Sequence, residues 1–174
     1  MKKSIILILN LFLLIFIVTV DQLTKILSQK YLIYNTKNII DNILSLTYVE
    51  NKGVAFGILS GRNLFIIILT SLIALITIRL FLNALNLKKY NFCFLSNMIF
   101  AGFLGNFIDR IRFGFVIDFL SLDFINFPIF NIADIFVTIP TFIIMIYILK
   151  LEDNEIYSLF SLKGGNNDKR KKKI

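Results

Sequence analysis

Long apolar runs alternate with polar segments along the chain. Four runs stand out, at residues 4–20, 64–82, 92–108 and 135–149. A helix needs roughly 17–25 residues to cross the hydrocarbon core of a bilayer. The first three runs have that length, and the fourth reaches it if residues 127–134 are partly immersed. The pattern therefore predicts an all-α membrane protein, built as a bundle of four transmembrane helices.

Short strand-like segments lie between these runs, on one side of the predicted bundle. Residues 43–49 (ILSLTYV) and 113–119 (FGFVIDF) are rich in β-branched and aromatic residues, which favour strands. Residues 51–57 (NKGVAFG) place two glycines around a turn, where a close backbone approach is expected. We therefore expect a small β-cradle and loop region at one end of the helices.

The composition agrees with a membrane protein of one domain. Hydrophobic residues make up 57% of the chain and charged residues 17%. A soluble domain has roughly 45–50% apolar residues and about a quarter charged residues. Four spans leave no room for a second folded unit, so residues 1–150 are predicted to be a single membrane-embedded domain. Residues 151–174 end in the basic run DKRKKK and are predicted to be a disordered tail.

The distribution of charge predicts the orientation in the membrane. Lysine and arginine are in excess at both termini and in the linker at residues 83–91, whereas the segments 21–63 and 109–134 are balanced. Cytoplasmic segments of membrane proteins are enriched in these residues. We therefore expect a multi-pass protein of the cytoplasmic (inner) membrane with both termini in the cytoplasm and an extracytoplasmic β-cradle. The basic tail is typical of contact with anionic lipid rather than with nucleic acid.

The residue types that are missing narrow the possible chemistry. The chain has no histidine and one cysteine, Cys93. A disulfide framework, a Ser-His-Asp or Cys-His arrangement and a histidine-ligated zinc site are therefore excluded. We expect no metal and no cofactor, so any catalysis has to rest on carboxylates, lysine, tyrosine or hydroxyl groups.

Polar residues gather at the ends of the predicted helices that face the β-cradle. An ionisable residue at the centre of a span costs about 2.5–3.5 kcal/mol. Asp21 and Lys25 follow the first run, GNFIDR at 105–110 ends the third, and FNIAD at 130–134 begins the fourth. Three helix ends thus present polar groups to the same rim.

Each of these groups also has a purely structural interpretation. Asp21 and Lys25 are four residues apart and would pair on a helix face. Asn131 would cap the last helix, with Asp134 in its first turn. Glycines in the third helix would allow close helix packing. These interpretations and a functional one do not exclude each other.

The functional interpretation is a pair of carboxylates, Asp118 and Asp134. Both lie among apolar residues, and the 16-residue spacing allows the chain to fold back on itself. Two adjacent carboxyl groups cannot both ionise easily, so they share one proton. The charged member can then activate water, while the neutral member binds a carbonyl oxygen and later protonates the leaving nitrogen.

Four motifs occur in a defined order: DQLTK at 21–25, NKGVAFG at 51–57, GNFIDRIRFGFVIDF at 105–119 and FNIAD at 130–134. This set resembles lipoprotein signal peptidase, the type II signal peptidase of bacteria, over nearly the whole chain up to about residue 150. The resemblance implies an aspartic endopeptidase of the cytoplasmic membrane. Such an enzyme removes the signal peptide from diacylglyceryl-modified prolipoproteins by cutting before the lipidated cysteine of the lipobox.

The resemblance also assigns roles to individual residues. Asp118 and Asp134 match the catalytic pair. Asn106 and Arg110 match positions that support this pair and hold the substrate backbone, whereas Asp109 is expected to be structural. The complete set of positions expected to bind substrate or support the site is Asp21, Lys25, Asn51, Gly53, Gly102, Asn106, Arg110, Asn131 and Ala133.

Two features depart from the family pattern. Ile135 stands where the family often has serine or threonine, and the segment 123–131 (DFINFPIFN) is short and lacks a Trp-His pair often found there. Neither change removes a catalytic group, so we expect them to alter the shape of the outer loop and substrate preference. The loop between Gly53 and Gly57 is hypothesised to clamp over the substrate peptide.

The expected partners are lipid-modified prolipoproteins and membrane lipid, with the protein acting as a monomer. One alternative is a small proton-coupled transporter that uses Asp118 and Asp134 as a proton relay. Relays of that kind lie near the midplane of discontinuous helices, often in repeats, and the sequence has no visible repeat. A second alternative is a non-enzymatic scaffold whose polar rim docks a partner. Only the peptidase requires the two carboxylates to lie close together.

Overall fold

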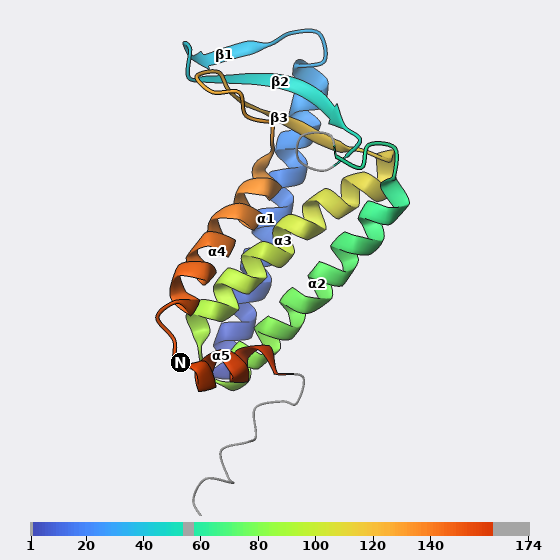
Figure 1. Cartoon of the computed structure of the whole chain (residues 1–174). Coiled ribbons are helices and arrows are strands. Elements are labelled where there is room, and N and C mark those ends of the chain that lie inside the picture. The colour runs from blue at the N-terminus through green and yellow to red at the C-terminus, as the bar shows by residue number, and fades with distance from the viewer. Residues whose placement is uncertain (1, 54–57, 162–174) are drawn as a thin grey trace, which may run out of the picture.

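The computed structural model describes residues 2–53 and 58–161, and within these ranges the chain forms five helices and a three-stranded sheet. The long helices pack against one another in a bundle, and the sheet lies across one end of it (Figure 1), here called the sheet end. The elements in chain order are α1 (Lys3–Tyr31), β1 (Lys37–Ile40), β2 (Leu44–Asn51), α2 (Asn63–Asn86), α3 (Tyr90–Phe113), β3 (Val116–Leu122), α4 (Ile132–Ile148) and α5 (Asp153–Phe160).

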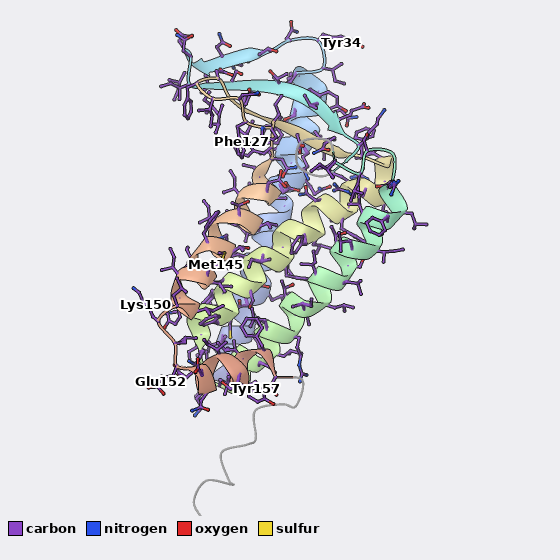
Figure 2. The ribbon with its side chains drawn as sticks, viewed as in Figure 1. Tyr34, Phe127, Met145, Lys150, Glu152 and Tyr157 are labelled. Carbon is purple, nitrogen blue, oxygen red and sulfur yellow. The ribbon has the colours of Figure 1, made fainter. Side chains whose placement is uncertain are left out.

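The bundle has the features of a membrane protein. Helices α1, α2 and α3 are each long and apolar enough to cross a bilayer, and α4 is an apolar helix of 17 residues. Large apolar side chains project outward along the helices (Figure 2), and Phe12 and Leu64 are 70% and 71% exposed. In water such a surface would be unfavourable, because burial of apolar area drives folding. A mostly helical membrane fold with a small sheet is therefore confirmed.

Helix α3 lies at the centre of the bundle and packs against α1, α2 and α4. It continues to Phe113, beyond the predicted end at residue 108, and stops at Gly114, which has a left-handed backbone with φ of 81°. Glycine adopts this conformation without steric cost and commonly ends helices. Helix α1 likewise continues past residue 20 to Tyr31. The polar motifs that follow the first and third apolar runs are therefore helical.

Helix α4 starts at Ile132, three residues before the predicted boundary, because Asn131 caps it. The Asn131 side chain accepts a hydrogen bond from the backbone N–H of Asp134, and the Asp134 side chain accepts one from the backbone N–H of Asn131. This reciprocal pair is a capping box, which satisfies two backbone donors at a helix start. The predicted capping role of FNIAD is confirmed.

The three strands form one antiparallel sheet in the order β1-β2-β3. Strands β2 and β3 correspond to the two predicted segments. Strand β1 was not predicted, since its four residues are all exposed and show no alternation. In the β2–β3 register Val49 lies opposite Asp118 and Asn51 opposite Val116. The sheet thereby brings Asn51 and Asp118 to the end of the helix bundle.

The prediction that residues 151–174 are disordered is wrong for residues 153–160, which form α5. This helix lies at the end of the bundle opposite the sheet, close to the N-terminus (Figure 1). Leu159 is fully buried, and the Asn83 side-chain amide donates to the backbone carbonyls of Leu159 and Ser161 at 2.7 and 3.0 Å. Lys89 pairs with Glu155 at 2.6 Å. The basic run after residue 161 lies outside the described residues.

Two glycines of α3 bring this helix close to its neighbours. A Cβ atom on Gly102 would lie 2.5 Å from the Ala133 carbonyl oxygen and 2.8 Å from Val137 Cγ2 of α4. A Cβ atom on Gly105 would lie 2.5 Å from an Asp21 carboxylate oxygen of α1. Small residues allow such close approach between membrane helices, so these positions determine how near α1 and α4 come to α3.

We predict that Gly102→Ala lowers the midpoint of thermal unfolding in detergent. The added methyl group meets backbone of α4, and such overpacking costs about 1–3 kcal/mol, which outweighs the ~1 kcal/mol that alanine gains over glycine in a helix. Ile111→Ala, on the exposed face of the same helix, is the control and should change the midpoint less. A Gly102→Ala variant as stable as the parent would contradict the close packing of α3 and α4.

Candidate active site

The two predicted catalytic acids lie in one cavity at the sheet end. Asp118 is on β3 and Asp134 in the first turn of α4, and both line a cavity of about 470 Å³. Asp118 is only 2% exposed. Strand β3 and the start of α4 meet here because the isolated bridge between Leu120 and Phe130 joins β3 to the chain just before α4. The fold therefore brings the two acids together from separate elements.

Asn131 connects the two carboxyl groups. Its side-chain amide donates to Asp118 Oδ1 at 2.6 Å, and its backbone N–H donates to Asp134 Oδ2 at 3.1 Å. Among the hydrogen bonds of the described residues, none joins the two carboxyl groups directly. A single asparagine at the helix cap thus fixes the orientation of both acids.

Two further asparagines hold the remaining carboxyl oxygens. Asn51 Nδ2 of β2 donates to Asp118 Oδ2 at 2.8 Å, and Asn106 Nδ2 of α3 donates to Asp134 Oδ1 at 2.8 Å. Every oxygen of the two acids therefore accepts a hydrogen bond from an asparagine. The pair is held rigidly by neutral groups, which orient the acids without adding a full charge.

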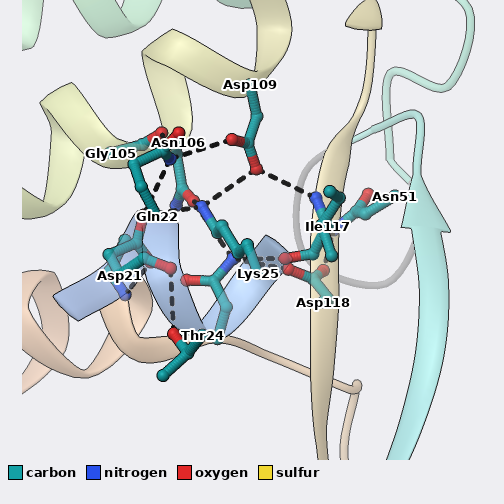
Figure 3. Close-up of polar contacts among 12 residues, drawn as sticks. Asp21, Gln22, Thr24, Lys25, Asn51, Gly105, Asn106, Asp109, Ile117 and Asp118 are labelled. Atoms are coloured by element: carbon teal, nitrogen blue, oxygen red, sulfur yellow. Dashed lines mark hydrogen bonds and ion pairs between the residues drawn. The ribbon is translucent and has the colours of Figure 1, made fainter. Parts of the chain in front are cut away.

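A buried lysine lies beneath these asparagines (Figure 3). Lys25 Nζ of α1 lies 3.0 Å from Asp21 Oδ2 and 3.0 Å from Asp109 Oδ2, and it donates to Asn106 Oδ1 at 2.9 Å. The Lys25 side chain is 1% exposed. Because Lys25 binds the oxygen of Asn106, the amide nitrogen of Asn106 is directed to Asp134. The ion pairs thus orient a residue that contacts the candidate catalytic acid.

Gln22 and Asp109 have larger roles than the sequence indicated. Gln22 Nε2 lies within hydrogen-bond distance of Asp21 Oδ2, Asp109 Oδ1 and the Gly105 carbonyl, at 3.2, 3.0 and 3.2 Å. Asp109 also accepts from the backbone N–H of Ile117 at 3.1 Å, which ties α3 to β3. Gln22 belongs to the DQLTK motif, and its position next to Asp21 is the sequence feature that could have indicated its place in the site.

The other predicted residues frame the site. Arg110 donates to the Gly53 carbonyl at 2.7 Å, and the Gly53 N–H donates to Asn51 Oδ1 at 3.0 Å. The Ala133 N–H donates to Asp21 Oδ1 at 2.9 Å. Gly102 lies on α3 against Ala133, as described above. Ten of the predicted residues are therefore at the sheet end and Gly102 lies on α3 against the first turns of α4, whereas the hypothesised clamp at 54–57 lies outside the described residues.

The cavity has a polar side and an apolar side. The polar side carries the two acids with Asn51, Asn106 and Arg110. The apolar side is formed by side chains before and within α4 and by one residue of α3, namely Phe103, Phe127, Ile129, Phe130, Ile135, Val137 and Ile139. Such a cavity can bind a chain that presents a polar backbone beside an apolar group. Within the described ranges, no three acidic or cysteine side chains group as metal ligands.

Burial raises the pKa of Asp118 from its ordinary value near 3.8 to about 7. Loss of solvation is the largest cause and the charge of Asp134 adds to it, whereas the hydrogen bonds from Asn51 and Asn131 and the charge of Lys25 oppose it. Burial disfavours the ionised form of a carboxyl group, and so does a nearby like charge. At neutral pH Asp118 therefore holds a proton for a large part of the time.

Comparison with known proteins identifies a family model and relatives that match most of the chain. Residues 13–150 match the family model described as signal peptidase (SPase) II. A lipoprotein signal peptidase of Streptococcus agalactiae serotype Ia is 40% identical over 141 residues, which cover 80% of this chain and 91% of that protein. The corresponding protein of Caldicellulosiruptor bescii is 40% identical over 138 residues, covering 79% and 88%.

Two solved structures of bacterial membrane enzymes are also similar to this chain. A bacterial membrane enzyme determined by the in meso method at 2.3 Å resolution is 37% identical and superposes with a TM-score of 0.74, covering 84% of this chain and 90% of that chain. A second, at 1.9 Å, has 36% identity, a TM-score of 0.72 and coverages of 82% and 94%. The fold is therefore that of a bacterial membrane enzyme. The chain belongs to the signal peptidase II family, whose members are proteases.

We predict that Lys25→Met destabilises the protein by about 3–5 kcal/mol, the cost of breaking a buried ion pair from one side. Methionine keeps the length of the side chain but leaves Asp21 and Asp109 buried without a cation. Thermal unfolding in detergent measures the loss, with Lys30→Met, an exposed position on the same helix, as the control. If both variants unfold at the same temperature, the ion pairs do not support the site.

The raised pKa of Asp118 predicts a pH dependence of stability. The folded chain holds this proton up to about pH 7 and the unfolded chain only up to about 3.8, so the folded state binds more protons in this window and its stability falls as pH rises. Asp118→Asn mimics the neutral acid. The variant should unfold at temperatures close to those of the parent near pH 4, and should become the more stable of the two by pH 8.

Asp41→Asn is the control for this measurement, because Asp41 lies in the exposed turn between β1 and β2. Because this variant leaves Asp118 in place, it should keep the pH dependence that the parent owes to Asp118. A difference between Asp118→Asn and the parent that is constant from pH 4 to pH 8 would show that Asp118 ionises as easily in the fold as in the unfolded chain.

Proposed function

We propose that this protease is an aspartic endopeptidase that removes the signal peptide of lipid-modified prolipoproteins. The observation that carries the proposal is the pair Asp118 and Asp134, which line one cavity and are joined through Asn131. Relatives of similar length are named lipoprotein signal peptidases, which supports this substrate class. No histidine or metal ligand is needed for the reaction derived below.

The reaction follows from the charges of the two acids. Asp118 holds the shared proton, and Asp134 acts as the carboxylate. Asp134 takes a proton from water as the water oxygen bonds to the scissile carbonyl carbon, while Asp118 donates a hydrogen bond to the carbonyl oxygen. A proton then passes to the leaving nitrogen and the C–N bond breaks. The products are the carboxyl terminus of the signal peptide and the amino group of the lipidated cysteine.

The substrate would be bound by the two sides of the cavity. Its peptide backbone would lie against Asn106 and Arg110, and its apolar side chains against Phe127 and Ile139. Helix α4 borders the cavity and is apolar along its length, so the acyl chains of the substrate can remain in the lipid beside it. This arrangement accounts for an active site at the end of a helix bundle, because the scissile bond lies next to a lipid anchor.

The same proposal includes the arrangement in the membrane. Helices α1 to α4 would each span the bilayer, and α4, although 17 residues long, meets the lower limit of roughly 17 residues for a span. The excess of lysine and arginine at the end opposite the sheet supports a cytoplasmic location for both termini. The sheet end would then face outward from the cytoplasmic membrane, and one chain would suffice for activity, since all site residues belong to it.

The location of the acids also bears on the transporter alternative. A proton relay across the membrane needs ionisable groups near the middle of the spans. Asp118 lies on a strand and Asp134 in the first turn of a helix, both at one end of the bundle. The described residues therefore favour hydrolysis at the membrane edge.

We predict that purified protein cuts a diacylglyceryl-modified lipobox peptide before the modified cysteine, and that Asp118→Asn and Asp134→Asn each lower the rate. Removal of a general acid or base lowers a rate by roughly 100- to 10,000-fold. Mass spectrometry of the products measures the rate and the position of the cut. Asp41→Asn should cut at the rate of the parent. Near-normal cutting by either site variant, with its fold intact, would remove that aspartate from the mechanism.

We also predict that the rate falls as pH rises through about 7. Asp118 supplies a proton to the leaving nitrogen, and its pKa is raised to about 7, so its proton is present below this pH and lost above it. The ratio kcat/KM reports the pKa values of the free enzyme, so rates at substrate concentrations well below KM, measured between pH 5 and pH 9, test this. A rate that rises steadily up to pH 9 would mean that the ionised form of Asp118 is the active one.

A further inference from the structure

At the end of the bundle opposite the active site, three elements enclose a second polar pocket. It has a volume of about 450 Å³ and is lined by Lys3, Leu85, Asn86, Lys88 and Tyr90. The start of α1, the end of α2 and the start of α3 contribute four of these residues, and the turn between α2 and α3 contributes Lys88. We call it the lysine pocket. Its lining has two cations and no carboxylate, so it is complementary to an anion.

The lysine pocket is organised by contacts between elements that are distant in sequence. Lys3 Nζ donates to Asn86 Oδ1 at 3.2 Å, which joins the first turn of α1 to the last turn of α2. Asn86 uses its oxygen in this bond, so its amide nitrogen is the remaining donor of that side chain. Buried Leu85 provides the apolar floor. A lysine ammonium, a side-chain amide and a tyrosine hydroxyl can all donate to a phosphate oxygen.

The backbone at Lys88 supports a role for its side chain. Lys88 has a left-handed backbone with φ of 57°, a conformation that costs other residues roughly 1–2 kcal/mol and that glycine adopts freely. The next residue, Lys89, is neutralised by Glu155 at 2.6 Å, whereas Lys88 lines the pocket. Glycine would be less strained at this position. The presence of lysine there is consistent with a role for its charged side chain in the pocket.

The location of the lysine pocket identifies the source of the anion. Lys3 and Lys88 flank the ends of helices that are long and apolar enough to cross a bilayer, so the pocket lies where lipid headgroups meet the helix ends. Tyrosine is enriched at this level in membrane proteins, and lysine there attracts anionic lipids. We infer that the lysine pocket binds the phosphate of an anionic phospholipid, whose acyl chains lie along the apolar bundle.

Binding of phosphatidylglycerol to the full chain in detergent, followed by native mass spectrometry, tests this inference. The variant Lys3→Gln with Lys88→Gln should bind roughly 25-fold more weakly, since each lysine beside an anionic surface contributes about a fivefold gain. The control Lys30→Gln with Lys37→Gln removes the same charge from exposed positions at the sheet end. Both variants keep the basic tail, so its contribution to binding is equal in the two proteins.

Chemical labelling of lysines with a water-soluble acylating reagent locates the bound lipid. Phosphatidylglycerol should protect Lys3 and Lys88 from acylation, whereas phosphatidylcholine should not, and Lys30 and Lys37 should react equally in both. Inorganic phosphate added at millimolar concentration should leave the protection unchanged. Equal lipid binding by the two double variants would overturn the inference, and so would displacement of the lipid by inorganic phosphate, which would identify a site for the free anion.

Discussion

The placement of two carboxyl groups, buried Asp118 and half-buried Asp134, in one cavity at the end of an apolar bundle is the constraint on which the rest of the site depends. A buried carboxylate loses its hydration, and a second one nearby adds repulsion. The structure offsets this cost with neutral donors, because Asn51, Asn106 and Asn131 together contact all four carboxyl oxygens. Neutral donors stabilise the acids without removing the competition for one proton, which is the property that the proposed chemistry uses.

A second layer of charged groups holds one of these asparagines, Asn106, in place. Lys25 lies between Asp21 and Asp109 and turns the amide of Asn106 toward Asp134. The lysine and its two acids lie on α1 and α3, so the contacts also join the two helices. Asp109 extends this link to β3 through the Ile117 N–H. The same contacts join the helices and orient a residue that the proposed catalysis uses, so the purely structural and the functional interpretations of these residues are compatible.

Much of this arrangement could be predicted from the sequence. The apolar runs predicted the helices, since a span needs a long apolar stretch, and FNIAD predicted both a helix cap and an acid at the site. The motif set assigned the eleven site residues to one region, and their contacts show that they do lie together. The helix ends were less predictable, because Asp21, Lys25 and Asp109 are charged residues outside the apolar runs, and their burial depends on ion pairs between α1 and α3.

Other features depend on contacts that are distant in sequence. Gln22 contacts Asp109, which is 87 residues away, and nothing in the local pattern of DQLTK indicates that partner. Strand β1 has no alternation and exists through its pairing with β2. Helix α5 follows a polar segment, and its docking depends on Asn83 and on the pocket that receives Leu159. The Gln22–Asp109 contact, strand β1 and the docking of α5 all depend on tertiary packing, which local sequence patterns do not show.

The proposed mechanism requires Asp118 and Asp134 to hold one proton between them at neutral pH. Nuclear magnetic resonance of protein labelled with ¹³C at the aspartate carboxyl carbon measures this directly, with Asp118→Asn and Asp134→Asn providing the assignments. The Asp118 carboxyl resonance should titrate with a midpoint near 7, and this midpoint should fall when Asp134 is replaced by asparagine. If both carboxyl groups are fully ionised at pH 5, no proton remains for the leaving nitrogen and the account is contradicted.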